Sequence, residues 1–157
     1  MSRAERAKEY FRQGFACSQA VALAFLDVIG MDETTVKKIT LPFGGGLGRL
    51  RLTCGAVSGM AIVIGAVIGT GENSPENKKA VYQITQELCA EFKEKNGSLI
   101  CEELLTGANI QTEKGGSPEK RTQEYYKKRP CAEIVFSTAE ILEKYLMRTG
   151  KISPSKE

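Results

Sequence analysis

An apolar segment of 14 residues, residues 56–69, restricts the fold more than any other part of the sequence. It is shorter than the roughly 20 residues that a membrane-spanning helix needs, so we expect a helix buried in the core of a soluble protein. Gly55 and Gly59, and then Gly65 and Gly69, are four residues apart, which puts each pair on one side of that helix. Because each glycine lowers helix propensity by about 1 kcal/mol relative to alanine, these positions predict close packing.

Helical patterns continue through the rest of the chain, and no strand-like alternation persists for more than a few residues. Serine or arginine followed by proline marks expected helix starts at 74–75, 117–118 and 129–130. The sequence therefore predicts an all-α, single-domain helical bundle of about six to eight helices over residues 1–157. The expected helices cover residues 3–13, 15–29, 32–39, about 54–69, 75–96, a short stretch after Ser98, a stretch opened by 117–119, and the region after Pro130.

Residues 41–49, Leu-Pro-Phe-Gly-Gly-Gly-Leu-Gly-Arg, predict a loop between two of these helices. Proline blocks helix continuation, and glycine permits positive φ and close backbone approach. N–H groups in such a loop can donate to sulfur or to an anion. The spacing matches neither of the common phosphate-binding glycine motifs. The candidate cofactor-binding residues are Gly44, Gly45, Gly46, Gly48, Gly55 and Gly59.

The chain contains five cysteines and no histidine. Histidine is the commonest general base and metal ligand near neutral pH, so the chemistry that remains is that of sulfur. Four cysteines lie in the first turn of an expected helix, where unpaired N–H groups and the helix dipole stabilise a thiolate. These candidate redox thiols or metal ligands are Cys17, Cys54, Cys101 and Cys131. Cys89 falls in the middle of a helix and is expected to pack as a small apolar residue.

Charge and composition exclude several classes of protein. The net charge of +3 is small and dispersed, and the basic run at 127–129 is interpreted as a solvated helix face, so no nucleic-acid partner is expected. The first 14 residues are charged throughout and do not resemble a signal peptide. These features predict a cytoplasmic protein that is not an integral membrane protein, in which permanent disulfides are rare.

Taken in order, Cys17, FGGGLGR, CGAVSG, Cys101 and Cys131 resemble the C_GCAxxG_C_C family of redox-active proteins. GFACSQAV, CEELLTG and CAEIVFSTAEIL support the resemblance, which spans about residues 14–146. It carries the four signature cysteines onto the four candidate positions and leaves Cys89 without a counterpart. The resemblance implies a small helical protein with a cysteine-based redox centre in a metabolic or transport-linked setting.

The function expected from this pattern is electron transfer at a four-cysteine redox or metal centre, and two alternatives stay open beside it. The expected centre is an iron–sulfur cluster, or a site for zinc, held by thiolates that are 37, 47 and 30 residues apart. The first alternative is metal-free thiol–disulfide chemistry, with Cys54 beside Arg49 and Arg51 as nucleophile and Cys17 as resolving cysteine. The second alternative is a non-catalytic helical interaction module. The partners considered are a redox partner, a transporter-associated protein and a second copy of the chain. Whether the protein is an enzyme stays open at this point.

Overall fold

The computed structural model describes residues 1–153, and over this range the chain is all-α, as expected. The described residues contain no strand, and their single antiparallel bridge joins Thr53 to Ile100. Eight of the described helices have six residues or more, and α3 and α5 are single turns. The elements are α1 (Arg3–Arg12), α2 (Cys17–Leu23), α3 (Leu26–Ile29), α4 (Glu33–Thr40), the 3₁₀ turn η1 (Leu41–Phe43), α5 (Gly44–Leu47), α6 (Gly55–Ile68), α7 (Pro75–Asn96), α8 (Cys101–Gly107), α9 (Gln123–Lys128) and α10 (Cys131–Arg148).

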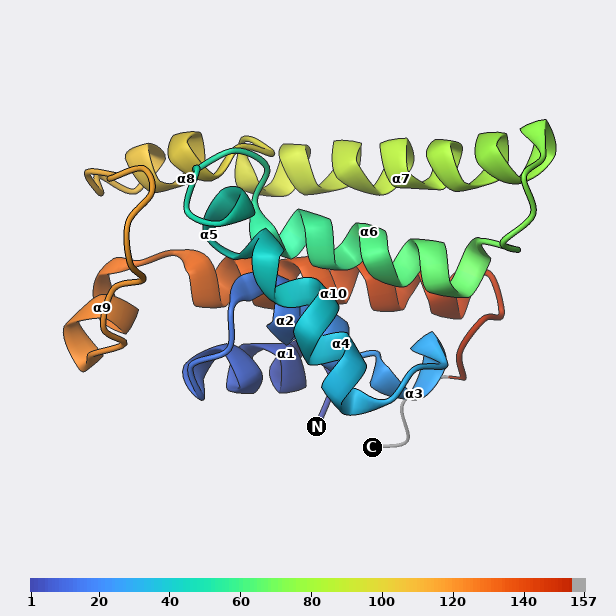
Figure 1. Ribbon diagram of the computed structural model, residues 1–157, viewed down its shortest axis with the longest axis horizontal. Helices are drawn as coiled ribbons and strands as arrows, with labels where there is room; N and C mark the ends of the chain where they lie inside the picture. Colours follow the sequence, from blue (N-terminus) through green and yellow to red (C-terminus); the bar gives the residue numbers. More distant parts are fainter. Residues whose placement is uncertain (154–157) are drawn as a thin grey trace.

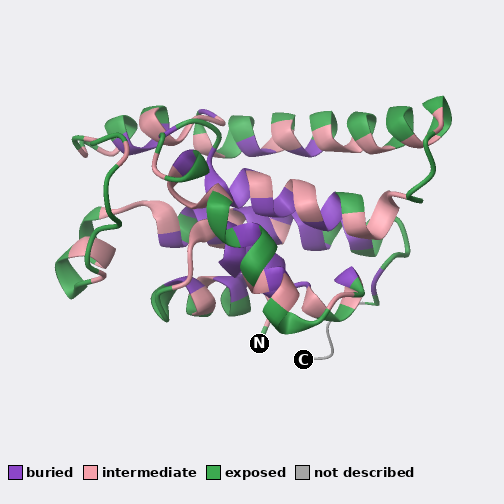
Figure 2. Ribbon diagram, in the orientation of Figure 1, coloured by how far each residue is buried: buried purple, intermediate pink, exposed green. Residues whose placement is uncertain are grey.

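The apolar helix α6 lies at the centre of the molecule and contacts α2, α7 and α10 (Figure 1). Met60, Val63 and Ile64 on α6 are fully buried, which explains why this helix is apolar over most of its circumference. The long helix α7 covers one side of α6 and α10, while α1, α2 and α4 lie on the other side. Buried residues gather between these layers, and the outer face of α7 is exposed (Figure 2). None of the described helices is long and apolar enough to cross a membrane.

Close packing is confirmed at Gly55 and Gly59 and wrong at Gly65, while a Cβ on Gly69 would lie 2.4 Å from the carbonyl oxygen of Gly65 in the same helix. A Cβ atom on Gly59 would lie 2.6 Å from the carbonyl oxygen of Ser18, and one on Gly55 would lie 3.3 Å from Cβ of Cys17. A Cβ on Gly65 would meet nothing within 4 Å. The first turns of α6 are therefore pressed against the start of α2, whereas the glycine two turns later faces open space.

The helix expected over residues 15–29 is divided into α2 and α3, so that prediction is wrong. The backbone leaves the helical region at Phe25, at φ −118° and ψ 19°, and the Phe25 ring is fully buried. Arg3 accounts for the break. Its Nη1 donates to the carbonyl oxygen of Ala24 at 2.9 Å, it pairs with Asp27, and its guanidinium lies 5.1 Å from the Phe25 ring centroid. Because Arg3 satisfies the carbonyl that the helix would have used, the helix can end there.

The helix start expected at residues 117–119 is also wrong. Helix α9 begins at Gln123, where the hydroxyl of Thr122 accepts a hydrogen bond from the first turn. Residues 118–122 have no regular secondary structure. Glu119 and Arg121 are instead bound to distant parts of the chain, and these contacts replace the local capping interaction that the sequence pattern predicts.

The start signals at residues 74–75 and 129–130 are confirmed, whereas Ser98 does not cap α8 directly. The Ser74 hydroxyl caps α7 by accepting from the Asn77 backbone at 3.1 Å, and α7 ends at Gly97, whose φ of 100° is in the left-handed region. Pro130 immediately precedes α10. The hydroxyl of Ser98 accepts from the backbone N–H of Ile100, the residue just before α8. Ser98 therefore binds the residue that precedes the helix and not an N–H group of its first turn.

Candidate functional site

A short backbone pairing joins the starts of α6 and α8. The backbone N–H of Cys54 donates to the carbonyl of Leu99 at 2.8 Å, and that of Cys101 donates to the carbonyl of Leu52 at 2.6 Å. Cys54 is the residue before α6, and Cys101 is the first residue of α8. Segments 47 residues apart in the sequence thereby place two of the four candidate cysteines at the same end of the molecule.

The other two candidate cysteines begin α2 and α10, which both contact α1 and each other. The side chains of Cys17 and Cys131 are hydrogen-bonded to one another. All four candidate cysteines line one cavity of about 500 Å³. The structure thus brings together the four helix starts, while Cys89 lies apart on α7 and packs against the core.

The surroundings of Cys54 and Cys101 raise the pKa of both thiols, although both residues lie at helix starts. Cys54 is only 6% exposed, and burial raises its pKa to about 12 even though the N–H groups of Ala56 and Val57 donate to its sulfur. Burial also raises the pKa of Cys101, opposed by the guanidinium of Arg51, whose Nη1 lies 3.8 Å from Sγ. The expectation that Cys54 is the low-pKa nucleophile is therefore wrong, because desolvation outweighs the helix start.

Cys131 has the opposite character. The hydrogen bond from Cys17 lowers the pKa of Cys131, and the positive charges of Arg129, Arg121 and Arg51 lower it further, against the effect of burial. The same hydrogen bond, together with burial, raises the pKa of Cys17 well above its ordinary value. The two pKa values are therefore shifted in opposite directions, which makes Cys131 the more readily ionised thiol of the pair and Cys17 the hydrogen-bond donor.

The glycine loop contains a left-handed turn. Every residue from 45 to 49 has a positive φ, and so does Arg51, at 61°. Glycine adopts this conformation without strain, but Leu47, Arg49 and Arg51 do so at a cost of about 1–2 kcal/mol each. Strain of this kind is kept only where surrounding contacts enforce it, and it is common at functional sites.

The loop packs rather than donates along much of its length. The N–H groups of residues 48–52 donate to carbonyls of residues 42–47, so these donors are used within the loop itself. A Cβ on Gly46 would lie 2.6 Å from Cβ of Cys101. Gly59 lies outside the cavity against Ser18. The predicted glycines that line the cavity are Gly44, Gly45, Gly46, Gly48 and Gly55.

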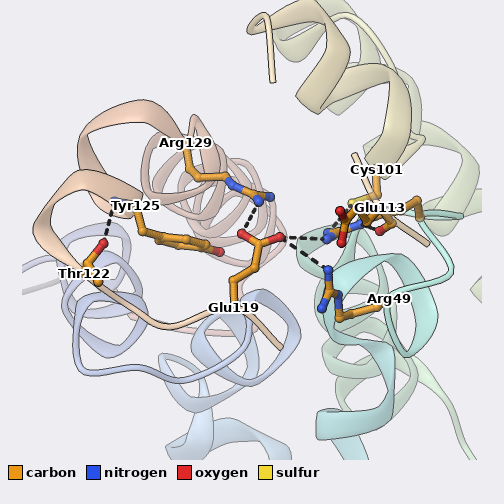
Figure 3. Close-up of polar contacts among 8 residues, drawn as sticks. Arg49, Cys101, Glu113, Glu119, Thr122, Tyr125 and Arg129 are labelled. Atoms are coloured by element: carbon orange, nitrogen blue, oxygen red, sulfur yellow. Dashed lines mark hydrogen bonds and ion pairs between the residues drawn. The ribbon is translucent and has the colours of Figure 1, made fainter. Parts of the chain in front are cut away.

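Charged residues that sequence reasoning did not assign to the site surround the cysteines. Glu119 Oε1 lies 3.4 Å from Nη2 of Arg49 and 3.5 Å from Nη2 of Arg51, and its Oε2 accepts from Arg129 (Figure 3). The Arg121 guanidinium donates to two carbonyl oxygens near the end of α1 and also lines the cavity. The Tyr125 ring lies 4.9 Å from the guanidinium carbon of Arg129.

The basic run at 127–129 is not uniformly a solvated face. The side chain of Lys128 is 68% exposed, as interpreted, but that of Arg129 is only 9% exposed and lines the cavity. The one sequence feature that indicates a place for Arg129 in the site is its position two residues before Cys131. Glu119 belongs to the start signal at 117–119, which indicates a helix rather than a site, and no motif includes Arg121.

The four thiols are suitable metal ligands by their chemistry, but their arrangement does not form a metal site. Four thiols suit an iron–sulfur cluster or zinc by chemistry. Within residues 1–153, however, no group of three or more cysteine, aspartate or glutamate side chains could hold a metal ion. The sulfurs share a cavity without forming a closed ligand set.

The fold and the cavity together define a class: a small all-α protein whose four thiols share one cavity with four arginines. The sequence profile described as "Putative redox-active protein (C_GCAxxG_C_C)" matches residues 15–145. The chain belongs to this family of redox-active proteins. No curated protein and no solved structure matches it.

Proposed function

We propose that the protein carries out thiol–disulfide exchange, with Cys131 as the nucleophile and Cys17 as the resolving cysteine. The observation that carries this proposal is the hydrogen-bonded pair itself, in which Cys17 lowers the pKa of Cys131 beside three guanidinium groups. A thiolate is the nucleophile in such exchange, and a neighbouring thiol is needed to release the mixed disulfide.

One round of exchange needs only the reduced protein and the substrate disulfide. The Cys131 thiolate attacks one sulfur of a substrate disulfide, forms a mixed disulfide and releases one substrate thiolate. Cys17 then loses its proton to that thiolate and attacks Sγ of Cys131, which releases the second substrate thiolate. The protein is left with a Cys17–Cys131 disulfide after losing two electrons, and the substrate disulfide has been reduced to one thiol and one thiolate.

Single replacements test this assignment. The reduced full chain is treated with the uncharged 2-hydroxyethyl disulfide, and adducts are located by mass spectrometry. Cys17→Ser is expected to accumulate a mixed disulfide on Cys131, because the resolving thiol is absent. Cys131→Ser is expected to react much more slowly, and Cys89→Ser should react like the unchanged protein. Reaction of Cys131→Ser at the unchanged rate would contradict the proposal.

An iron–sulfur centre is the second candidate, supported by the fact that all four signature thiols line the same cavity. Cys17, Cys54, Cys101 and Cys131 would hold the cluster, which would supply one-electron transfer. The sulfurs would have to approach one another more closely than in this structure. Anaerobic reconstitution with iron and sulfide, followed by absorption spectroscopy and metal analysis, tests this candidate, and zinc is tested in parallel. Protein that stays colourless and metal-free would exclude it.

The interaction-module alternative makes a different prediction for the same side chains. Replacement of all four signature cysteines by serine would leave folding and partner binding intact, because the cysteines would be structural only. The redox partner, the transporter-associated protein, the homodimer and the cytoplasmic location remain predictions from the sequence.

A further inference from the structure

The charged side chains that line the cavity are unbalanced. Four are arginines and one is a glutamate, and no lysine or aspartate lines it. We propose that Arg49, Arg51 and Arg129 bind a carboxylate of the substrate, and that Glu119 occupies this place when no substrate is bound. The substrate class is then a small disulfide or thiol that carries a carboxylate. The disulfide part of this inference rests on the proposed function, whereas the carboxylate site does not.

Glu119 shows how the arginines hold a carboxylate. Its two oxygens face three guanidinium groups, two from the glycine loop on one side and one from Arg129 on the other (Figure 3). The side chains of Arg49, Arg51 and Arg129 are 13%, 6% and 9% exposed, but that of Glu119 is 40% exposed. The arginines thus form the buried wall, and the glutamate reaches them from the solvent side.

One donor at this site has no partner. Among the described residues, Nε of Arg49 is buried without a hydrogen bond. A buried donor that stays unpaired is costly, so a ligand oxygen that reached it would be favoured. Arg49 also has a strained backbone, with φ at 66°, and its carbonyl accepts from Gly115 at 2.8 Å. These contacts hold the guanidinium at the cavity although a relaxed backbone would turn it elsewhere.

The segment that carries Glu119 is fixed at both ends but irregular between them. Gly115 is bound to the backbone of the glycine loop, and Arg121 donates to the carbonyl oxygens of Phe11 and Phe15 at 3.1 and 3.2 Å. No helical hydrogen bonds hold residues 116–120 between these two points. Glu119 can therefore leave the arginines without disrupting a helix.

The size and lining of the cavity indicate a small molecule. A volume of about 500 Å³ lies within the range of roughly 300–1,000 Å³ that is typical of small-molecule sites. Leu104, Leu105 and Ile134 also line it and suit a short carbon chain between the carboxylate and the sulfur. Because Cys131 lines the same cavity, a ligand held there by its carboxylate has its disulfide in the cavity that contains the Cys131 side chain.

Binding is tested first without redox chemistry. The probe is suberate, the unreactive carbon analogue of dithiodipropionate, titrated into the reduced full chain by isothermal titration calorimetry at low salt. Suberate is expected to bind the unchanged protein. Glu119→Gln is expected to bind it about fivefold more tightly or better, because the competing carboxylate is gone, and Arg49→Gln more weakly.

Matched controls separate this effect from net charge and from folding. Glu124→Gln removes the same charge from an exposed residue that pairs with Lys128, so its suberate affinity should equal that of the unchanged protein. If circular dichroism shows that Glu119→Gln does not fold, Glu119→Ala replaces it in the suberate titration. Equal or weaker binding by the folded Glu119 variant, or no binding by any variant, would overturn the inference.

Reaction rates then distinguish the two proposals. Dithiodipropionate and its uncharged diamide are compared, each relative to its reaction with free cysteine. A rate preference for the acid that is lost in Arg49→Gln supports the inference. Reaction of both compounds without preference leaves the exchange activity standing and overturns the carboxylate site. Suberate binding without reaction of either disulfide leaves the carboxylate site standing and overturns the exchange activity.

Discussion

At the scale of single residues, the same side chain at the same kind of position acquires opposite properties. Cys54 and Cys131 both stand at helix starts, where the dipole favours a thiolate. Burial raises the pKa of Cys54 to about 12, whereas a hydrogen bond from Cys17 and nearby arginines lower that of Cys131. Desolvation and specific charges therefore outweigh the helix terminus.

Alkylation should reveal this difference. A lowered pKa means that the Cys131 thiolate is present at lower pH, so iodoacetamide is expected to label Cys131 at a pH at which Cys54 stays unlabelled. Labelling of each cysteine is measured by mass spectrometry across pH 6–10. In Cys17→Ala the labelling of Cys131 should shift to higher pH, because alanine has no side-chain hydrogen-bond donor. Labelling of Cys54 before Cys131 would contradict the assignment.

Prediction from sequence succeeds for the positions of these residues and fails for their environments. The sequence pattern places Cys17, Cys54, Cys101 and Cys131 correctly at helix starts, because helix boundaries depend on residues that are close in sequence. Which thiol is ionised depends on arginines from three separate segments, and no local pattern predicts that. Arg129 illustrates the limit, since its basic neighbours are typical of a solvated surface while its own side chain is buried.

At the scale of elements, glycine spacing predicts a helix face but not what the face contacts. Gly55/Gly59 and Gly65/Gly69 have the same spacing. The first pair meets the start of α2, and Gly65 meets nothing. The difference arises because Gly65 follows Gly59 by six residues, which turns it to a different side of α6, where it is exposed to solvent.

Two alanine substitutions on α6 should therefore have opposite effects. Gly59→Ala is expected to destabilise the fold by about 1–3 kcal/mol, because its Cβ would lie 2.6 Å from the Ser18 carbonyl oxygen. Gly65→Ala is expected to stabilise it by up to about 1 kcal/mol through helix propensity, since its Cβ meets open space. Urea unfolding followed by circular dichroism measures both. Similar effects of the two substitutions would contradict the packing described for α6.

The division between α2 and α3 shows a second limit at this scale. Residues 15–29 have an uninterrupted apolar pattern that predicts a single helix. The break depends on Arg3, which lies outside this range and reaches the carbonyl of Ala24 only when α1 packs beside α2. Local propensity is continuous there, and a tertiary hydrogen bond interrupts it.

At the scale of the whole molecule, the site is built from distant segments. Cys17 and Cys131 begin α2 and α10, near opposite ends of the sequence. A disulfide between them would close most of the chain into one loop. Such a cross-link restricts the unfolded chain far more than the folded one, in which the two side chains already touch.

Oxidation should therefore stabilise the protein as well as change its redox state. The chain-entropy model predicts that a disulfide closing a loop of this length adds about 5 kcal/mol to the free energy of unfolding. Urea unfolding with and without dithiothreitol measures the difference. Cys89→Ser should keep it, and Cys17→Ser should lose it. Equal stability of the oxidised and reduced forms would exclude this cross-link.

The sequence by itself determined the all-α class, the buried helix around residues 56–69, most helix starts and the family of four-cysteine proteins. These features depend on periodicity, capping and motif order, which act over a few residues or are read along the chain. Only the tertiary structure decided that the four thiols share a cavity, that the pKa is lowered for Cys131 and raised for Cys54, and that Glu119 faces three arginines. Desolvation and charge pairing depend on which distant segments meet, and folding alone brings those segments together.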